Sequence, residues 1–265
     1  MLSNSGEVKP RFFPAPWLKR LAPVCALVGC LTLAGCADSP SEATAPSAGD
    51  EVPSGPVSGT VIERVEPTQP SHTEPVLADD ARTLIVLGDS ISAAYGIQRE
   101  QGWVALMQQE LLANEFNWRA INASISGDTT GGGLARLPGL LETYNPDLVI
   151  IELGGNDGLR GYPVEQIEAN LTRMVELVTD NGGQPALVSM RIPPNYGPRY
   201  TTAFDGVFAK VAQATDTPLL PFIMENVALV EGMMQADGIH PTADAQPVLL
   251  EALWPGVEAL LAGME

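Results

Sequence analysis

Hydrophobic and polar positions follow two repeating patterns between residues 81 and 265. Short apolar runs bounded by Gly, Pro, Asn or Asp are typical of buried strands. Such runs lie at 83–87, 118–124, 147–153, 185–190 and 218–221. Segments with apolar residues at helical spacing lie near 101–115, 131–144, 163–180, 199–214 and 242–262. Because strands and helices alternate, we predict an α/β fold in which a mostly parallel five-stranded sheet is covered on both faces.

The first 35 residues have the pattern of an export signal. Four basic residues precede an apolar segment: Lys9, Arg11, Lys19 and Arg20. The apolar segment, 21–33, has the length of a signal-peptide core and is too short for a comfortable membrane span. The sequence LAGC at 33–36 resembles a bacterial lipobox, which implies cleavage before Cys36 and lipid attachment to its sulfur. The alternative is an ordinary signal peptide, or a short anchor, with a chance cysteine.

Residues 36–80 differ in composition from the rest of the chain. They are rich in Pro, Ser, Ala, Gly and acidic residues, so they cannot bury enough apolar surface to offset the entropy of ordering. We predict a disordered acidic tether between the lipidated Cys36 and a catalytic domain at 81–265. The protein is then an exported bacterial lipoprotein facing the periplasm. Ala37, in place of the aspartate that retains some lipoproteins in the inner membrane, favours the outer membrane.

Charge and residue counts narrow the chemistry. The chain has 14 Lys and Arg against 32 Asp and Glu, a net charge of −18, which argues against a nucleic-acid partner. The three cysteines all lie in the first 36 residues, so the domain has no disulfide frame and no thiolate metal site. The two histidines are His72, in the tether, and His240. A mechanism that needs a histidine base must therefore use His240.

Four polar blocks stand out in the domain. They are GDS at 88–90, NASISGDTT at 122–130, LGGNDGLRG at 153–161 and DGIHP at 237–241. The first three follow predicted strands, and the carboxyl ends of parallel strands share the edge of the sheet where ligands bind. We therefore expect these blocks to meet at one site.

The blocks supply the groups that acyl transfer needs. A serine hydroxyl is a weak nucleophile until a base takes its proton, and Ser90 and His240 are the candidate pair. Asp237 lies three residues before His240, a spacing that lets its carboxylate reach the ring nitrogen facing away from Ser90. Each group also has an ordinary alternative, since Ser90 can cap a helix and Asp237 with Gly238 can form a turn.

Three donors are candidates for stabilising an oxyanion. They are the backbone N–H groups of Ser90 and Gly127 and the side-chain amide of Asn156. The ordinary alternatives are a turn at Gly127 and a turn at Asn156 and Asp157. The G-x-S-x-G elbow of the α/β-hydrolases occurs nowhere in the chain, nor does a zinc-protease or P-loop signature.

Taken together, GDS, Gly127, GGND and DGIH resemble the blocks of the SGNH, or GDSL, hydrolase family. The similarity is closest to its subgroup of bacterial thioesterases that are also lysophospholipases and arylesterases, and it spans nearly all of 83–262. The resemblance implies a three-layer α/β/α fold, no metal and no organic cofactor. It also implies a catalytic triad of Ser90, Asp237 and His240, with Ser90, Gly127 and Asn156 as the oxyanion hole.

The same resemblance sets the expected activity. It implies hydrolysis of carboxylic esters and thioesters of acyl chains through an acyl-enzyme, with a small acyl ester or a lysophospholipid as substrate. We also expect a shallow, open groove for the acyl chain. The candidates for lining it are apolar residues of two loops and of the region before His240: Leu159, Ile192, Pro193 and Met233. Ordinary loop packing is an equal alternative for each of them. We expect a monomer. Two other functions stay open, a deacetylase of a cell-envelope polysaccharide and a lipoprotein that binds acyl groups without turnover.

Overall fold

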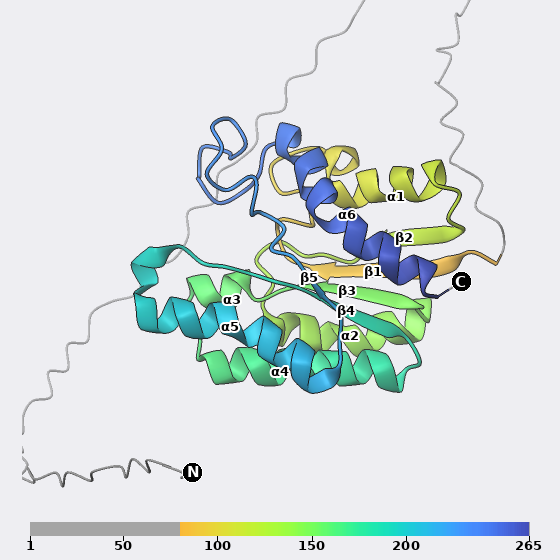
Figure 1. Cartoon of the computed structure of the whole chain (residues 1–265), viewed down its shortest axis with the longest axis horizontal. Helices are drawn as coiled ribbons and strands as arrows, with labels where there is room; N and C mark the ends of the chain where they lie inside the picture. Colours follow the sequence, from red (N-terminus) through yellow and green to blue (C-terminus); the bar gives the residue numbers. More distant parts are fainter. Residues whose placement is uncertain (1–79, 265) are drawn as a thin grey trace, which may run out of the picture. The chain divides into compact units, whose positions relative to one another are not determined.

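The structure, a computed structural model of the chain, describes residues 80–264. The predicted signal peptide at 1–35, Cys36 and nearly all of the predicted tether lie outside the described residues. Figure 1 shows the described part as a sheet with helices on both sides. No helix within 80–264 combines the length and the apolar character needed to cross a membrane.

Five parallel strands form the sheet. Their order in space is β2-β1-β3-β4-β5. The strands are β1 (Arg82–Gly88), β2 (Trp118–Asn122), β3 (Leu148–Glu152), β4 (Gln184–Val188) and β5 (Leu219–Leu220). The order reverses between β1 and β3, because the chain passes from β1 to β2 on one side and then crosses to β3 on the other. Such a switch point opens a crevice at the carboxyl ends of the two strands.

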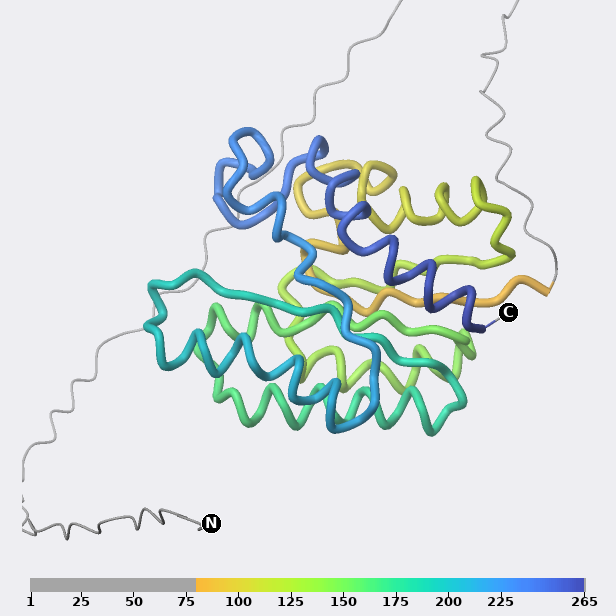
Figure 2. Tube along the Cα trace, viewed as in Figure 1, coloured from red at the N-terminus to blue at the C-terminus, as the bar shows by residue number. Residues whose placement is uncertain are grey.

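Two helical layers cover the sheet, as Figures 1 and 2 show. One layer consists of α1 (Trp103–Ala113) and α6 (Gln246–Ala262). The other consists of α2 (Thr130–Tyr144), α4 (Val164–Asp180) and α5 (Pro198–Thr215). The predicted three-layer α/β/α fold is thereby confirmed.

Side chains of the central strand β1 alternate between two cores. Leu84 and Val86 pack with α1 and α6, whereas Ile85 and Leu87 pack with α2, α4 and α5. All four are fully buried, which explains why a strand covered on both faces is a continuous apolar run in the sequence.

Several details differ from the sequence prediction, including the strand expected at 218–221, which has only two residues. The strand expected at 118–124 ends at Asn122, and the helix expected from 242 starts with a 3₁₀ turn (Ala243–Ala245) before α6. A short helix, α3 (Gly155–Leu159), replaces the turn that Asn156 and Asp157 suggested as an alternative. Because Gly and Asn have low helix propensity, local sequence does not predict α3.

The register of β1 and β3 sets the position of the polar blocks. Gly88 pairs with Glu152, the last residues of the two strands. The segments that follow them, Asp89–Ser90 and 153–159, therefore leave the sheet side by side at the switch point.

Two glycines of α2 provide a matched test of this packing. A Cβ on Gly139 meets nothing within 4 Å, so we expect Gly139→Ala to raise the free energy of unfolding by about 0.5–1 kcal/mol through helix propensity. A Cβ on the buried Gly133 would overlap the Leu153 side chain. Because overpacking typically costs about 1–3 kcal/mol, Gly133→Ala should lower the free energy of unfolding. Urea unfolding followed by circular dichroism measures both, and equal shifts would contradict this packing.

Candidate active site

Ser90 lies in a tight turn directly after β1. The backbone N–H groups of Ala93 and Tyr95 donate to the carbonyls of Asp89 (2.9 Å) and Ser90 (3.1 Å). Ala94 within this turn has a φ of +60°, a left-handed conformation that side chains rarely adopt. The turn leaves Ser90 partly exposed at the carboxyl edge of the sheet.

Asp237 and His240 belong to one turn that precedes α6. Asp237 Oδ1 accepts from the backbone N–H groups of Ile239 (2.9 Å) and His240 (3.0 Å), while Oδ2 lies 2.6 Å from His240 Nδ1. Gly238 has a φ of +67°, which a residue without a Cβ adopts without strain. The hydrogen bond with the His240 ring holds the pKa of Asp237 well below its usual range, so the carboxyl stays ionised.

The three side chains form a continuous chain of hydrogen bonds. His240 Nε2 lies 2.9 Å from Ser90 Oγ. Since the ionised Asp237 can only accept, the proton of the neutral ring belongs on Nδ1, and Nε2 is left as the acceptor for the serine hydroxyl. This is the geometry in which a histidine removes a proton from a nucleophilic serine.

Tyr95 is a neighbour of the histidine that the sequence did not indicate. Its ring lies 4.3 Å from the His240 ring, centroid to centroid. Gln235 Nε2 donates to the carbonyls of Tyr95 (2.8 Å) and Pro241 (2.9 Å). Gln235 therefore ties the turn that carries His240 to the turn that carries Ser90.

Gly127 is exposed in a turn after β2. The turn is closed by the Asp128 N–H, which donates to the Ile125 carbonyl at 3.1 Å, and Gly127 has a φ of +80°. Arg160 Nη2 donates to the Gly127 carbonyl at 3.1 Å. Among residues 80–264, no acceptor is recorded for the Gly127 N–H, so this group is available to an oxyanion.

Asn156 lies in the first turn of α3. Its Nδ2 donates one hydrogen to Asp89 Oδ2 at 3.1 Å and retains a second. The helix is held against α2 by Asp157, which is buried and accepts from the N–H (2.8 Å) and Oγ1 (2.6 Å) of Thr130. Thr130 follows Gly127 by three residues, so Asp157 fixes the positions of two candidate oxyanion donors relative to each other.

Two buried carboxyls behind Ser90 were not predicted as site residues. Asp89 is 3% exposed, and burial raises its pKa to about 6. Glu152 is fully buried, and burial together with the nearby Asp89 carboxylate raises its pKa well above the usual value. The signal for Glu152 was a charged residue at the end of an otherwise apolar strand.

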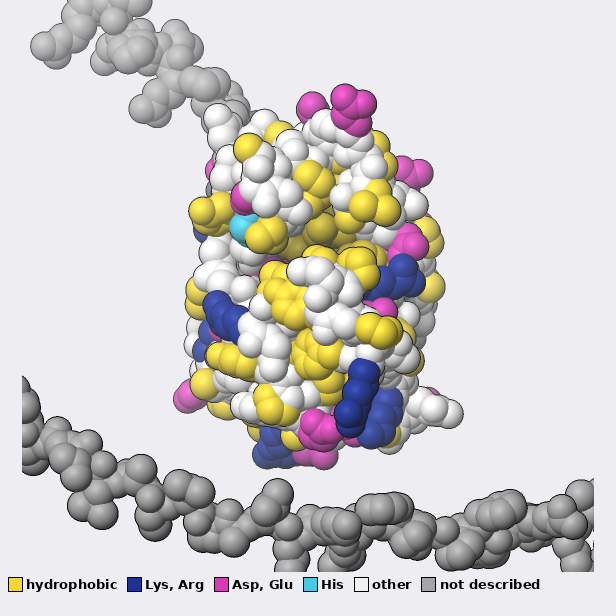
Figure 3. Space-filling model, turned by 90° about the vertical axis from the view of Figure 1, so that its left-hand side faces the viewer, with side chains coloured by type: hydrophobic (Ala, Val, Ile, Leu, Met, Phe, Trp, Pro, Cys, Tyr) yellow, Lys and Arg dark blue, Asp and Glu magenta, His cyan; other side chains and the backbone are white. Residues whose placement is uncertain are grey.

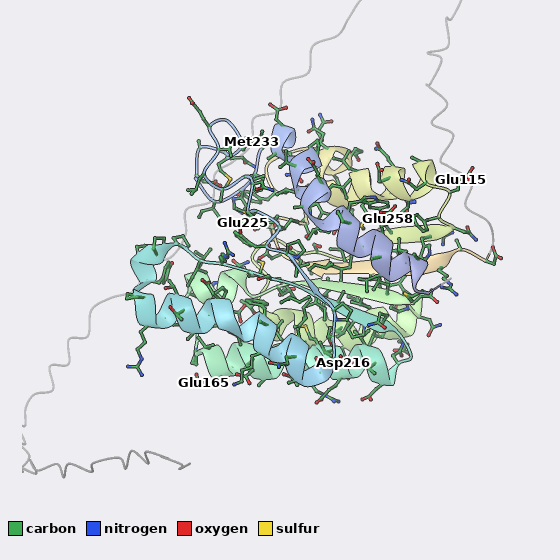
Figure 4. The ribbon with its side chains drawn as sticks, viewed as in Figure 1. Glu115, Glu165, Asp216, Glu225, Met233 and Glu258 are labelled. Atoms are coloured by element: carbon green, nitrogen blue, oxygen red, sulfur yellow. The ribbon has the colours of Figure 1, made fainter. Side chains whose placement is uncertain are left out.

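The four candidate lining residues have different environments. Leu159 is half-buried, Pro193 is exposed, and Ile192 is 9% exposed and belongs to the core beside α5. Met233 is half-buried in the loop before α6, where Figure 4 labels it, and packs against the α1 and α6 core. Figure 3 shows a hollow with apolar side chains across this face of the molecule and the histidine at one end. A separate hollow of about 390 Å³, between α1 and α6, includes none of the site residues.

Comparisons with known proteins agree with this geometry. The model of the GDSL-like Lipase/Acylhydrolase family matches residues 86–246. Esterase TesA of Pseudomonas aeruginosa is 54% identical over 181 residues, which are 68% of this chain and 90% of that protein. A crystal structure of TesA superposes with a TM-score of 0.66 and covers 68% of this chain and 99% of its own.

Two further relatives are named for other activities. The arylesterase of Vibrio mimicus is 47% identical over 168 residues, 63% of this chain and 84% of that protein. Thioesterase 1/protease 1/lysophospholipase L1 of Escherichia coli K12 is 46% identical over 171 residues, 64% of this chain and 81% of that protein. The predicted resemblance is therefore confirmed: the chain belongs to the GDSL-like lipase/acylhydrolase family and is a hydrolase of ester bonds.

Proposed function

We propose that Ser90 is the nucleophile of this esterase, with His240 as its general base and Asp237 as the group that orients the base. The observation that carries the proposal is the unbroken chain from Ser90 Oγ through the His240 ring to Asp237, with separations of 2.9 and 2.6 Å. His72, the other histidine, lies outside the described residues.

The proposed reaction proceeds in two halves. Ser90 Oγ attacks the carbonyl carbon of the ester while its proton passes to His240 Nε2. The resulting oxyanion accepts hydrogen bonds from the backbone N–H groups of Ser90 and Gly127 and from the side-chain amide of Asn156. The tetrahedral intermediate collapses, His240 returns the proton to the departing alkoxide or thiolate, and an acyl-serine remains. Water then attacks the acyl carbonyl with the same base, which releases the carboxylic acid and restores Ser90.

We further propose that the substrates are small acyl esters, aryl esters and lysophospholipids. The names of the relatives span esterase, arylesterase and thioesterase/lysophospholipase, which suits an open groove of low selectivity. Candidate lining residues are Leu159, Ile192, Pro193 and Met233. The predicted export signal makes acyl-CoA an infrequent substrate, because that thioester is cytoplasmic.

The anchor is a separate proposal. The segment 33–36 has the lipobox sequence LAGC, so we propose a mature protein that starts at a lipidated Cys36 and faces the periplasm, on the outer membrane. Each buried CH₂ of an acyl chain contributes about 0.8 kcal/mol, and stable anchoring needs at least two chains or signals. We also propose that the protein acts as a monomer.

Ser90→Ala should abolish turnover of a panel of p-nitrophenyl esters of rising chain length and of lysophosphatidylcholine, because it removes the nucleophile. A fluorophosphonate probe should label the wild-type protein and fail to label the variant. His240→Ala should be nearly as inactive, while the matched His72→Ala should retain full activity. A folded wild-type protein that shows neither labelling nor ester turnover would indicate an acyl-binding protein, and turnover confined to acetylated glycans would indicate a deacetylase.

Asn156→Ala should lower kcat by about 100- to 1,000-fold, the usual cost of one oxyanion donor. KM should change little, because the charge that Asn156 stabilises develops only in the transition state. Steady-state kinetics with p-nitrophenyl butyrate measure both. Asn181→Ala, at the end of α4, is the matched control and should leave kcat unchanged. An unchanged kcat in Asn156→Ala would return Asn156 to a purely structural role.

Cys36→Ala should abolish lipidation, as mass spectrometry would show, and leave either an unprocessed precursor or a soluble product that moves to water in detergent partitioning. Cys30→Ala, its matched control in the apolar segment, should leave lipidation intact. Specific activity on a soluble ester should stay near that of the wild type, since Cys36 is far in sequence from every candidate site residue. A wild-type protein that partitions into water and carries no lipid by mass spectrometry would refute the anchor.

A further inference from the structure

We propose that Asp89 is a positioning residue that fixes the orientation of the Asn156 amide. In this orientation Nδ2, and not Oδ1, faces the oxyanion. The inference rests on the proposed function, because it presupposes that Asn156 is an oxyanion donor. It assigns a role to the second residue of the GDS block, which the proposed reaction does not use.

Both carboxyl oxygens of Asp89 are occupied by donors. Oδ1 accepts from the backbone N–H of Ile91 at 3.0 Å, and Oδ2 accepts from Asn156 Nδ2 at 3.1 Å. Asp89 is 3% exposed, so water does not compete for these positions. The residue that precedes the nucleophile thus contacts both the nucleophile turn and α3.

An asparagine side chain has two orientations that differ by a 180° rotation of its amide. One orientation directs the NH₂ group at Asp89, and the second hydrogen of that nitrogen stays free for a ligand. The other orientation would direct the amide oxygen of Asn156 at the carboxylate of Asp89. Two hydrogen-bond acceptors would then face each other in a buried environment with no proton between them. Asp89 therefore disfavours the orientation in which Asn156 would offer an acceptor to a developing negative charge.

This selection requires an ionised Asp89, a state that burial disfavours and that the hydrogen-bond donors around the carboxyl favour. Burial is the largest influence on Asp89, whose pKa is raised to about 6, and the charge of Asp128 acts in the same direction. The Ile91 N–H, the Asn156 amide and the charge of His240 act in the opposite direction and lower it. Glu152 accepts from Ser92 Oγ (2.6 Å) and the Asp89 N–H (3.3 Å), and its pKa lies well above the usual value through burial and the Asp89 charge. The two donors on Asp89 and the charge on His240 therefore favour ionisation of Asp89, whereas burial and the Asp89 charge disfavour ionisation of Glu152.

A purely structural role is the competing explanation, since Asp89 Oδ1 also shapes the Ser90 turn through Ile91. A double-mutant cycle separates the two roles. Asp89→Asn has one acceptor oxygen where Asp89 has two, so it cannot serve both the Ile91 N–H and the Asn156 amide. Asp89→Ser retains an acceptor for the Ile91 N–H, as serine does in turns, but its side chain is too short to reach Asn156.

The experiment measures kcat and KM of the full-length protein on p-nitrophenyl butyrate for each Asp89 variant, alone and with Asn156→Ala. We expect each Asp89 variant alone to lower kcat by about 10- to 100-fold with little change in KM, part of the cost of one oxyanion donor. In the Asn156→Ala background the same substitution should cost less than about 3-fold, because the amide it positions is gone. Circular dichroism and thermal unfolding verify that the variants are folded.

Glu152→Gln is the matched control, another buried acid changed to its amide. The amide oxygen can replace the acceptor that Ser92 uses, so kcat should stay within about 3-fold of the wild type. The same fold-loss for an Asp89 variant in both backgrounds would overturn the inference and show that Asp89 acts on Ser90 or on the fold. If Asn156→Ala alone is fully active while Ser90→Ala is inactive, the oxyanion role of Asn156 fails, and the inference fails with it.

Discussion

The parallel pairing of β1 with β3 is the constraint on which the rest of the site depends. With Gly88 opposite Glu152, the chain leaves both strands at the same point of the same edge. Ser90 and Asn156 then lie on neighbouring segments, although 66 positions separate them in the numbering of the sequence. A slip of the register by one residue would reverse the faces of the strand and separate the two segments. Such a slip would exchange the side chains of β1 between two differently packed cores, which is what disfavours it.

Two aspartates of the site show how environment sets the chemistry of the same side chain. Asp237 is satisfied by two backbone N–H groups and an imidazole, and its pKa is low. Asp89 is satisfied by a backbone N–H and an amide, but burial dominates and its pKa is raised to about 6. The first suits the orientation of a base that becomes positively charged during the reaction. The second orients a neutral amide, which donates a hydrogen bond to it and carries no charge during the reaction.

The strands and long helices were predictable because their apolar spacing is a local property. The same holds for Ser90, His240 and Asn156 as candidates, since each lies in a short polar block that follows a strand or precedes a helix. The helix α3 was not predictable, because the sequence GNDGL is a poor helix former and is held by Asp157 through Thr130 of another element. The role of Asp89 also depends on a contact across 67 positions, which no local pattern contains.

The turn that carries Asp237 and His240 is largely self-sufficient. The hydrogen bonds of the Asp237 carboxylate to the backbone and to the His240 ring all lie within four consecutive residues. By contrast, a single hydrogen bond joins the His240 ring to Ser90, which belongs to a different part of the fold. Partial detachment of this turn from the sheet edge would leave the acid–base pair assembled and the serine without its base. On heating, loss of activity is therefore expected to precede loss of the helical circular dichroism signal. Enzyme turnover then reports detachment of this turn more sensitively than circular dichroism, which follows the helices.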